Sequence, residues 1–267
     1  MDGLLKARSG PLQRLGANLH GCDEMSWEVK AGIMGKVQRE AAEYLLSHYP
    51  DVASKMTVEE YLHERNHMQE ELFRKVEPMT GAVALVRALT SLATGSNNIN
   101  FALKTSHLPE IFDLFPPTCI LTADSPEIRP GRGKPNPDIF LAAAHSLGRD
   151  VGTAEACTDA QRAERRRGIV FEDAVPGVKA GVSAGMHVVW VPDDNLRALF
   201  PDEDHGAAHV ISSLEEWRPE EWGLPALPVS RLERDEYASE ETRKRGDEEG
   251  SEGAPDEIGT GTSRTHA

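Results

Sequence analysis

Long apolar segments are missing from this chain. No uninterrupted apolar run in the 267-residue sequence approaches the length of about 20 residues that a bilayer-spanning helix needs. The N-terminal residues also lack the basic, apolar and small-residue regions of a secretory signal peptide. We therefore expect a soluble protein that works in the cytoplasm and has no membrane partner.

Cysteine and basic charge are both scarce. The three cysteines, Cys22, Cys119 and Cys157, are far apart and odd in number, so they fit neither a disulfide framework nor a zinc site. We expect free thiols. Acidic residues outnumber basic ones by 44 to 29, which gives a formal net charge of −15. Because nucleic acids bind to basic surfaces, this balance argues against a general nucleic-acid binder. No apolar surface signal indicates an oligomer, and we expect a monomer.

Two regions have too little apolar content to form a core. Residues 230–267 are polar, charged and rich in Gly, Ser, Glu and Asp, which predicts a disordered acidic tail. Residues 148–167 are also polar and end in a basic run, which predicts a surface insertion. The remaining length suits one α/β domain with an insertion or two small domains.

One stretch organises the rest of the chain. Residues 168–191 contain an apolar run that ends in Glu172 and Asp173, then a turn, a helix of small residues and a second apolar run. This order predicts a parallel β-α-β unit with both carboxylates at the carboxyl end of its first strand. Ligands of open α/β sheets bind at that end, and adjacent carboxylates favour a hard cation such as Mg²⁺. The alternative is a solvated acidic turn.

Two polar turns follow other predicted strands. A short apolar approach leads into residues 94–98, whose hydroxyl and backbone N–H groups suit a phosphate, although ordinary helix capping explains the same residues. Residues 119–122 form another candidate strand. After it, a stiff loop with two prolines carries Lys134 toward a helix that starts near Asp138. A positioned ammonium group is a common counter-charge for a phosphoryl group.

The chain is predicted to be helical from Trp27 until near Pro78, whereas residues 6–25 show no clear periodicity. Residues 37–47 and 57–75 favour helices, and the second begins with Thr57 as N-cap and Glu60 as its capping-box partner. The loop before the first of these helices is flanked by glycines and carries Lys36. A solvated lysine is the simple alternative to a ligand contact there.

Taken in order, four short segments resemble the four motifs of the haloacid dehalogenase-like hydrolases. They are the initial Asp2-Gly3, a Thr-Gly-Ser-Asn turn, a Gly-Lys-Pro-Asn-Pro-Asp loop and a strand ending Phe-Glu-Asp-Ala. The resemblance is closest to the subgroup that contains pseudouridine-5'-phosphatase, 2-deoxyglucose-6-phosphatase, glycerol phosphatase and β-phosphoglucomutase. It covers roughly residues 27–222 and the first five residues.

The resemblance implies a fold and a chemistry. The fold is α/β, a Rossmann-like parallel sheet with an inserted α-helical cap. The implied divisions are a remnant of the first motif at residues 1–5, a cap at 6–80 in which 6–25 are atypical, a core at 81–229 and the tail. In the implied reaction one aspartate attacks phosphorus, a second acts as general acid and base, and Mg²⁺ neutralises the phosphoryl oxygens.

The resemblance also assigns catalytic and metal-binding roles to five residues. Asp2 matches the acid/base aspartate, whose carbonyl group also reaches the metal. Thr94 matches the phosphate-binding residue of the second motif, and Lys134 matches the lysine that balances charge between nucleophile and phosphate. Glu172 and Asp173 match the pair that holds Mg²⁺ directly or through water.

Four further residues are candidates for binding the substrate. The N–H group of Gly95 belongs to the second motif, and Asn98 lies close to that turn. Lys36 and Arg39 lie where the cap of this family presents substrate-contacting residues. The implied substrate is a small phosphorylated metabolite, with pseudouridine 5'-phosphate preferred and a sugar phosphate next.

The first motif departs from the family pattern. In the family this motif is a buried strand ending Phe-Asp-x-Asp-Gly. The printed sequence starts one residue before Asp2, so the nucleophilic aspartate has no counterpart in it. Loss of a nucleophile is expected to lower catalysis by roughly four to six orders of magnitude. The sequence therefore leaves two hypotheses: a Mg²⁺-dependent phosphatase with an incomplete start, or a non-catalytic relative that binds phosphate or a metabolite.

Overall fold

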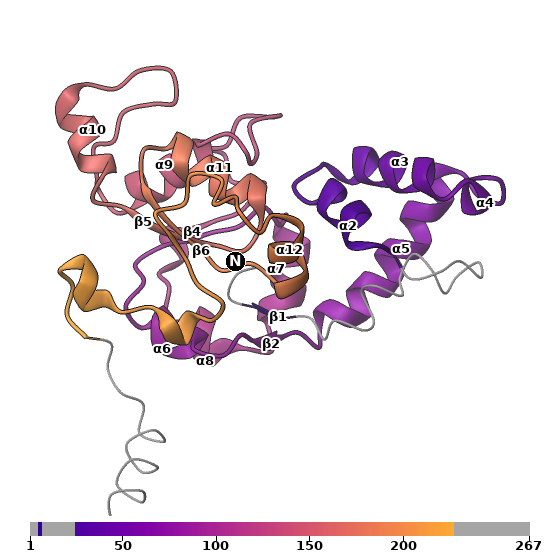
Figure 1. Ribbon diagram of the computed structural model, residues 1–267, viewed down its shortest axis with the longest axis horizontal. Coiled ribbons are helices and arrows are strands. Elements are labelled where there is room, and N and C mark those ends of the chain that lie inside the picture. Colours follow the sequence, from indigo (N-terminus) through magenta and orange to yellow (C-terminus); the bar gives the residue numbers. More distant parts are fainter. Residues whose placement is uncertain (1–4, 7–24, 227–267) are drawn as a thin grey trace, which may run out of the picture. The chain divides into compact units, whose positions relative to one another are not determined.

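The computed structural model describes residues 5–6 and 25–226 (Figure 1). Its strands are short; they are β1 (Leu5–Lys6), β2 (Glu77–Pro78), β3 (Leu92–Ala93), β4 (Ile120–Leu121), β5 (Ile169–Glu172), β6 (His187–Trp190) and β7 (His209–Val210). The predictions for Asp2, for Cys22 and for the tail at 230–267 lie outside the described residues. Within the described part of the chain, every helix is too short or too polar to cross a membrane.

Helices and short 3₁₀ turns make up about half of the remaining described chain. The N-terminal group comprises α2 (Trp27–Ile33), α3 (Gln38–His48), α4 (Pro50–Ala53) and α5 (Val58–Phe73). The later α-helices are α6 (Ala82–Val86), α7 (Asn98–Thr105), α8 (Pro109–Phe112), α9 (Asp138–Ser146), α10 (Asp159–Arg165), α11 (Val175–Ser183) and α12 (Asp194–Leu199). Short 3₁₀ turns are η2 (Pro117–Cys119), η3 (Leu214–Glu216) and η4 (Pro219–Trp222).

Helices α2 to α5, which we call the helical segment, contain an apolar cluster of their own. Its buried members are Ala42, Leu45, Leu46, Val52, Met56 and Tyr61. The predicted start of α5 is confirmed, because the Thr57 hydroxyl accepts the Glu60 N–H at 3.2 Å and the Glu60 carboxylate accepts the Thr57 N–H at 2.8 Å. This reciprocal pair satisfies two of the N–H groups that a helix start leaves unpaired.

The described core strands fall into two parallel half-sheets. β3 pairs with β4, and β5, β6 and β7 pair in that order, while β1 and β2 form a separate antiparallel pair. The predicted β-α-β unit is confirmed as β5, α11 and β6. Gly185, which follows α11, has the left-handed φ of 75° that favours glycine at a helix end.

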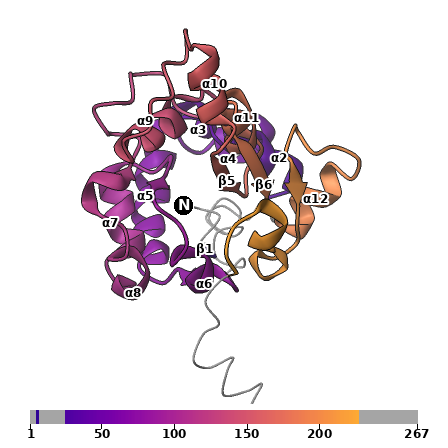
Figure 2. The ribbon, with the colours of Figure 1, turned by 90° about the vertical axis from the view of Figure 1, so that its left-hand side faces the viewer.

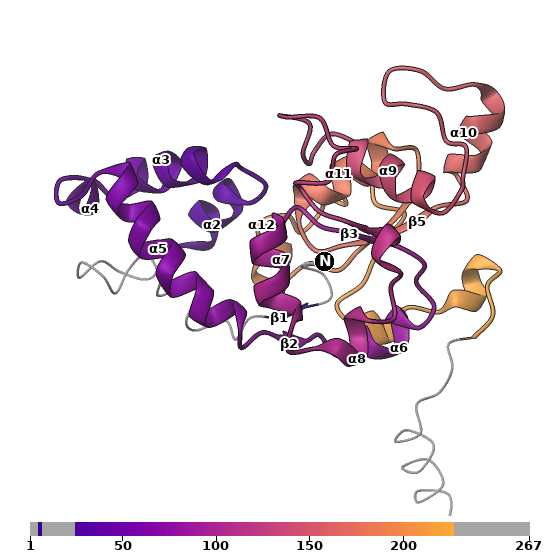
Figure 3. The same ribbon diagram turned by 180° about the vertical axis from the view of Figure 1, so that it is seen from behind.

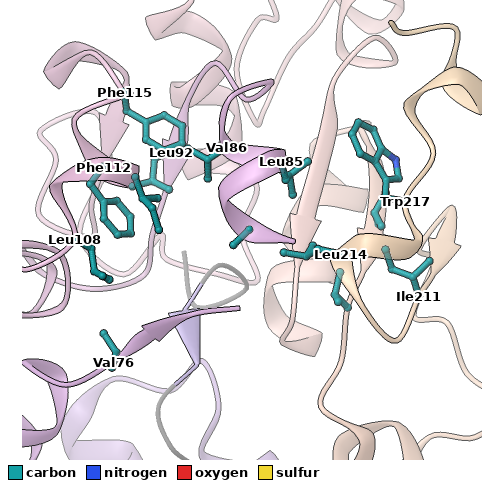
Figure 4. Close-up of a cluster of buried hydrophobic side chains, with 14 residues drawn as sticks. Val76, Leu85, Val86, Leu92, Leu108, Phe112, Phe115, Ile211, Leu214 and Trp217 are labelled. Carbon is teal, nitrogen blue, oxygen red and sulfur yellow. The ribbon is translucent and has the colours of Figure 1, made fainter. Parts of the chain in front are cut away.

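Alternate residues of both half-sheets face two different apolar cores. Leu92 of β3 and Val189 of β6 belong to the core beneath α6 and α8, part of which Figure 4 shows. Leu121 of β4 and Val170 of β5 belong to the core beneath α9 and α11. Because each core takes residues from both half-sheets, the half-sheets are neighbours in one layer. Helices α9 and α11 lie on one side of this layer and α6 and α8 on the other (Figures 2 and 3).

The direction of α9 shows which strand ends meet. The Cys119 thiol, at the start of β4, donates to the Ser146 carbonyl at the end of α9, with 3.8 Å between sulfur and oxygen. The beginning of α9 therefore lies toward the carboxyl end of β4. Lys134, in the loop before α9, binds the carboxylate of Glu172, the last residue of β5. The carboxyl ends of β4 and β5 thus share one edge of the layer, which we call the carboxyl edge.

The predicted surface insertion at residues 148–167 is mostly exposed, but one of its basic residues is buried. Arg165 is only 6% exposed. Its guanidinium donates from Nε to the Val151 carbonyl and from Nη2 to the Thr153 carbonyl, both at 2.6 Å. A buried guanidinium is tolerated where such acceptors replace its lost water. This stretch therefore packs against the core at Arg165.

Candidate functional site

The turn after β3 presents hydroxyl and backbone groups at the carboxyl edge. Thr94 is 1% exposed, and its N–H donates to the Leu121 carbonyl at 2.8 Å, which continues the β3–β4 ladder. Its hydroxyl accepts the Ser96 N–H at 3.0 Å. Gly95, between them, is exposed, and a Cβ there would meet no atom within 4 Å. An open backbone beside a hydroxyl has the chemistry to bind an anion.

This turn is joined to the end of β4. The Ala123 N–H donates to the Ser96 carbonyl at 2.9 Å. The Thr122 hydroxyl donates to Oδ1 of Asn98 at 2.8 Å. The Asn98 N–H in turn donates to the Asp124 carboxylate at 2.8 Å. Asn98 therefore fastens the two turns to each other, and its contact with a substrate stays a prediction.

A cation that sequence analysis did not select lies at the same turn. Lys104, near the end of α7, donates from Nζ to the Ser96 hydroxyl oxygen at 3.1 Å. Its ammonium also lies 4.4 Å from the ring centroid of Phe73, the last residue of α5. Helical side chains lean toward the helix N-terminus, which brings this late residue back to the turn that precedes α7.

Glu172 and Asp173 lie at the end of β5, as predicted. Glu172 is 3% exposed, and its carboxylate accepts from the Lys134 ammonium. A Cβ on Gly177 would overlap this carboxylate, so glycine in α11 leaves the space that Glu172 occupies. Asp173 is partly exposed, and its carbonyl accepts the Trp190 indole N–H at 3.0 Å. One carboxylate is therefore buried and paired, and the next residue is an aspartate that is partly exposed.

The loop that carries Lys134 is closed by ion pairs with Asp138. Arg132 donates to both Asp138 oxygens, at 3.1 and 2.8 Å, and Arg129 lies 3.2 Å from one of them. Burial alone raises the pKa of the Asp138 carboxyl, but the hydrogen bonds from Arg132 and Arg129 prevail and hold its pKa below the usual range. The Lys134–Pro135 peptide bond is cis. The ion pairs with Asp138 therefore link residues on both sides of Lys134, and the stiffness that its two prolines indicate stays a prediction.

The helical segment places Lys36 close to the acidic end of β5. The preceding Gly35 has a φ of 75°, and a Cβ there would lie 2.6 Å from the Pro176 side chain in the first turn of α11. The loop therefore packs against the residues that follow Asp173. The Lys36 ammonium lies 5.4 Å from the Tyr44 ring centroid. Its contact with a substrate stays a prediction.

Arg39 makes ion pairs within the helical segment. Its guanidinium binds Glu59 and lies 3.6 Å from Glu43 on the next turn of α3. The hydrogen bond to Glu59 raises the pKa of Arg39 and lowers that of the Glu59 carboxyl. All three side chains are more than half exposed, so these pairs contribute little to stability. The structure shows no contact between Arg39 and the carboxyl edge among the described residues.

Sequence analysis also missed Lys30, a second cation of the helical segment that faces the acidic end of β5. Its ammonium lies 3.4 Å from the Trp27 ring centroid. Burial lowers the pKa of Lys30, and the negative charges of Asp193 and Asp173 act in the opposite direction. Asp193 follows β6 as Asp173 follows β5. Because neighbouring parallel strands end at one edge, the sequence could have placed these two carboxylates together.

The acidic end of β5 fits Mg²⁺ in its donor chemistry. Glu172 and Asp173 offer carboxylate oxygens, the ligands that this hard cation takes. Among residues 25–226, no group of three or more His, Cys, Asp or Glu side chains is close enough to hold a metal. The third predicted ligand, Asp2, lies outside the described residues. The two described carboxylates could therefore supply part of a Mg²⁺ site.

Comparisons with known proteins identify the family. Residues 12–185 match the family model described as haloacid dehalogenase-like hydrolase. The chain is 36% identical over 213 residues to (DL)-glycerol-3-phosphatase 2 of Arabidopsis thaliana, covering 78% of this chain and 81% of that relative. It is 35% identical over 213 residues to a Saccharomyces cerevisiae protein named probable pseudouridine-5'-phosphatase, covering 76% and 85%. The chain belongs to the haloacid dehalogenase-like hydrolases, and by family it is a phosphatase.

Solved structures share the fold. A HAD family hydrolase from Deinococcus radiodurans R1, solved with bound phosphate and sodium, has a TM-score of 0.58 at 20% identity, covering 86% of this chain and 96% of that one. A HAD hydrolase of family IA, variant 3, from Entamoeba histolytica has a TM-score of 0.58 at 21% identity, covering 82% and 92%. The predicted Rossmann-like α/β class is therefore confirmed.

Proposed function

We propose that this chain is a Mg²⁺-dependent phosphomonoesterase that acts on a small phosphorylated metabolite. Relatives named for glycerol 3-phosphate and pseudouridine 5'-phosphate support that substrate class. We propose pseudouridine 5'-phosphate first and a sugar phosphate next. The observation that carries the proposal is the pair of Lys134 and Glu172, which joins a loop-borne cation to the acidic end of β5.

The phosphate would bind at the turn after β3. The Thr94 hydroxyl and the Gly95 N–H group would donate to phosphoryl oxygens, and the Lys104 ammonium beside Ser96 would add positive charge. Lys134 neutralises Glu172, which lessens the repulsion between the buried carboxylate and an incoming phosphate. The site therefore offers donors to the anion and limits the negative charge that it meets.

Glu172 and Asp173 would hold Mg²⁺ together with Asp2. When bound, the metal would neutralise charge on the phosphoryl oxygens. In this proposal Asp2 also donates a proton to the leaving group as general acid and then accepts one from water as general base. Impaired turnover of the chain as printed is part of the same proposal, because none of its residues matches the nucleophilic aspartate of the family.

The first experiment measures hydrolysis of p-nitrophenyl phosphate with and without Mg²⁺. It compares the chain as printed with a version in which a strand ending Phe-Asp is placed before Met1. We expect Mg²⁺-dependent turnover in the extended version and a rate lower by roughly four to six orders of magnitude in the printed chain. If neither folded protein hydrolyses the ester, the enzyme hypothesis fails, and a phosphate-binding or metabolite-binding relative remains.

A second experiment tests the substrate contacts of the helical segment. The extended version would be assayed on pseudouridine 5'-phosphate, glycerol 3-phosphate and a hexose phosphate. We expect Lys36→Gln to raise KM for the preferred substrate, because Lys36 lies in the loop packed on Pro176. Lys55→Gln is the matched control, because it removes the same charge from an exposed side chain of the helical segment that is not a candidate for substrate binding. Equal effects of both substitutions would contradict the role assigned to Lys36.

A further inference from the structure

One face of α2 lies against the core and carries a single charged residue. Residues 27, 30, 31 and 34 are spaced i, i+3, i+4 and i+7, so their side chains project from the same side of a helix. Trp27, Ala31 and Met34 pack, partly buried, against the core beneath α9 and α11. Lys30 lies among them on this face, where an apolar residue would be expected.

The contacts of α2 place this face over the carboxyl ends of β5 and β6. Helix α2 contacts α12, whose N-cap is Asp193 and accepts the Asn195 N–H at 3.0 Å. The loop after α2 contacts Pro176, at the start of the helix that follows β5. Asp173 and Asp193 emerge from these two strand ends. Lys30 therefore faces a pair of carboxylates that come from neighbouring strands.

The surroundings of Lys30 offset part of the cost of the water that its ammonium loses, although burial prevails and its pKa stays lowered. The Trp27 ring lies 3.4 Å from Nζ, within the range of a cation–π contact. The negative charges of Asp193 and Asp173 favour the protonated amine, against the effect of burial. Two carboxylates at one edge repel each other unless a cation lies beside them. Lys30 can relieve that repulsion when α2 is packed on the core.

We propose that Lys30 is a positioning residue: its ammonium docks α2 on the carboxylates of Asp173 and Asp193 and so places the Lys36 loop over the carboxyl edge. The role of Lys36 toward a substrate rests on the proposed function, whereas the docking itself does not. The competing explanation is that apolar packing alone holds α2, and that Lys30 only extends its polar end toward water.

Hydrogen exchange of the full chain, followed by mass spectrometry, tests the docking. In Lys30→Gln we expect exchange in residues 27–36 to accelerate about tenfold, as expected from losing one charge-assisted interaction. Lys30→Arg keeps the charge and should stay close to the unaltered protein. Lys179→Gln removes the same charge from the exposed side of α11 and should leave residues 27–36 unchanged. Raised salt should accelerate exchange in the unaltered protein more than in Lys30→Gln.

A variant of the partner keeps the test decisive if Lys30→Gln unfolds globally. Asp193→Asn removes the charge but retains an N-cap side chain for α12, because asparagine caps helices as well as aspartate does. It should accelerate hydrogen exchange in residues 27–36 but not in β6, which serves as the internal reference. The proposal is overturned if Lys30→Gln and Asp193→Asn are folded and leave exchange in residues 27–36 unchanged. It is also overturned if Lys30→Arg accelerates that exchange as much as Lys30→Gln does.

Enzyme kinetics give a second, independent test of the role of Lys30. In the extended phosphatase version, Lys30→Gln should raise KM more than it lowers kcat, and Lys30→Arg should restore KM. If the proposed function fails, no variant turns over and the exchange result is unaffected. If the docking fails, exchange is unchanged while turnover persists. The two failures are therefore distinguishable.

Discussion

The two half-sheets end at the same edge, but the chemical groups at their ends differ. The β3–β4 half ends mainly in hydroxyl, amide and backbone groups, and its one described carboxylate, Asp124, is bonded within the same turns, as Thr94 is to Ser96 and Thr122 to Asn98. The β5–β6 half ends in carboxylates, and its described counter-charges come from elsewhere: Lys134 from the loop before α9 and Lys30 from α2. The hydroxyl half is thus largely self-contained, whereas the acidic half depends on residues distant in sequence.

The comparison predicts the largest effect for removing a remote cation from the acidic half. Lys134→Met leaves Glu172 buried without that cation, and we expect the free energy of unfolding to fall by about 3 to 5 kcal/mol, the usual effect of breaking a buried ion pair. Urea unfolding measures this loss. The double variant Lys134→Met with Glu172→Gln removes both charges and should recover much of the stability. A single variant as stable as the unaltered protein would show that the pair is dispensable.

Two glycines, one in each half, give a matched steric test. Ala at Gly177 would press against the Glu172 carboxylate, which is buried and bonded to Lys134, so the ion pair must shift. We expect Gly177→Ala to lower the free energy of unfolding by about 2 kcal/mol, despite the better helix propensity of alanine. Gly95→Ala meets open space and should change it by less than about 0.5 kcal/mol. Equal losses would remove the distinction between the halves.

Sequence patterns were sufficient where a local rule governs the structure. The order of apolar run, small-residue helix and apolar run predicted β5, α11 and β6 with Glu172 at the strand end. The Thr57 capping box was predictable because both of its hydrogen bonds join residues three apart. The carboxylates and the loop lysine were likewise recognisable as candidates, since strand-end position and proline spacing are local properties.

Contacts between distant segments could not be predicted in the same way. No spacing rule links Lys134 to Glu172, or Lys30 to Asp173, because such pairs depend on how helices pack across strand ends. The burial of Arg165 was not predictable for the same reason: its acceptors are carbonyl groups of a loop that only the folded chain brings near. The exposure predicted for the polar stretch 148–167 therefore holds for most of its residues but not for Arg165, which tertiary packing buries.

The loop that serves the acidic half is expected to respond to acid. Because the folded-state pKa of Asp138 lies below its unfolded value, its contribution is present above the unfolded pKa and is lost as pH falls through the folded pKa. At neutral pH, Asp138→Asn should lower the free energy of unfolding by about 1 to 2 kcal/mol. Urea unfolding below about pH 4 should show the two proteins converging. If the difference in unfolding free energy between the two proteins is the same at every pH, the ion pairs of Asp138 with the arginines contribute nothing to stability.

The smallest effect is expected in the hydroxyl half. Thr94→Val keeps the buried shape but removes the acceptor of the Ser96 N–H, so we expect a loss of about 1 kcal/mol, the usual value for one neutral hydrogen bond. Thr94→Ser keeps the acceptor and is the control, measured by the same urea unfolding. A loss from Thr94→Val as large as that from Lys134→Met would contradict the comparison, because one neutral bond would then matter as much as a buried ion pair. A small loss would show that the bond between Thr94 and Ser96 is one of several that hold this turn, so that the Thr94 hydroxyl remains suited to bind an anion.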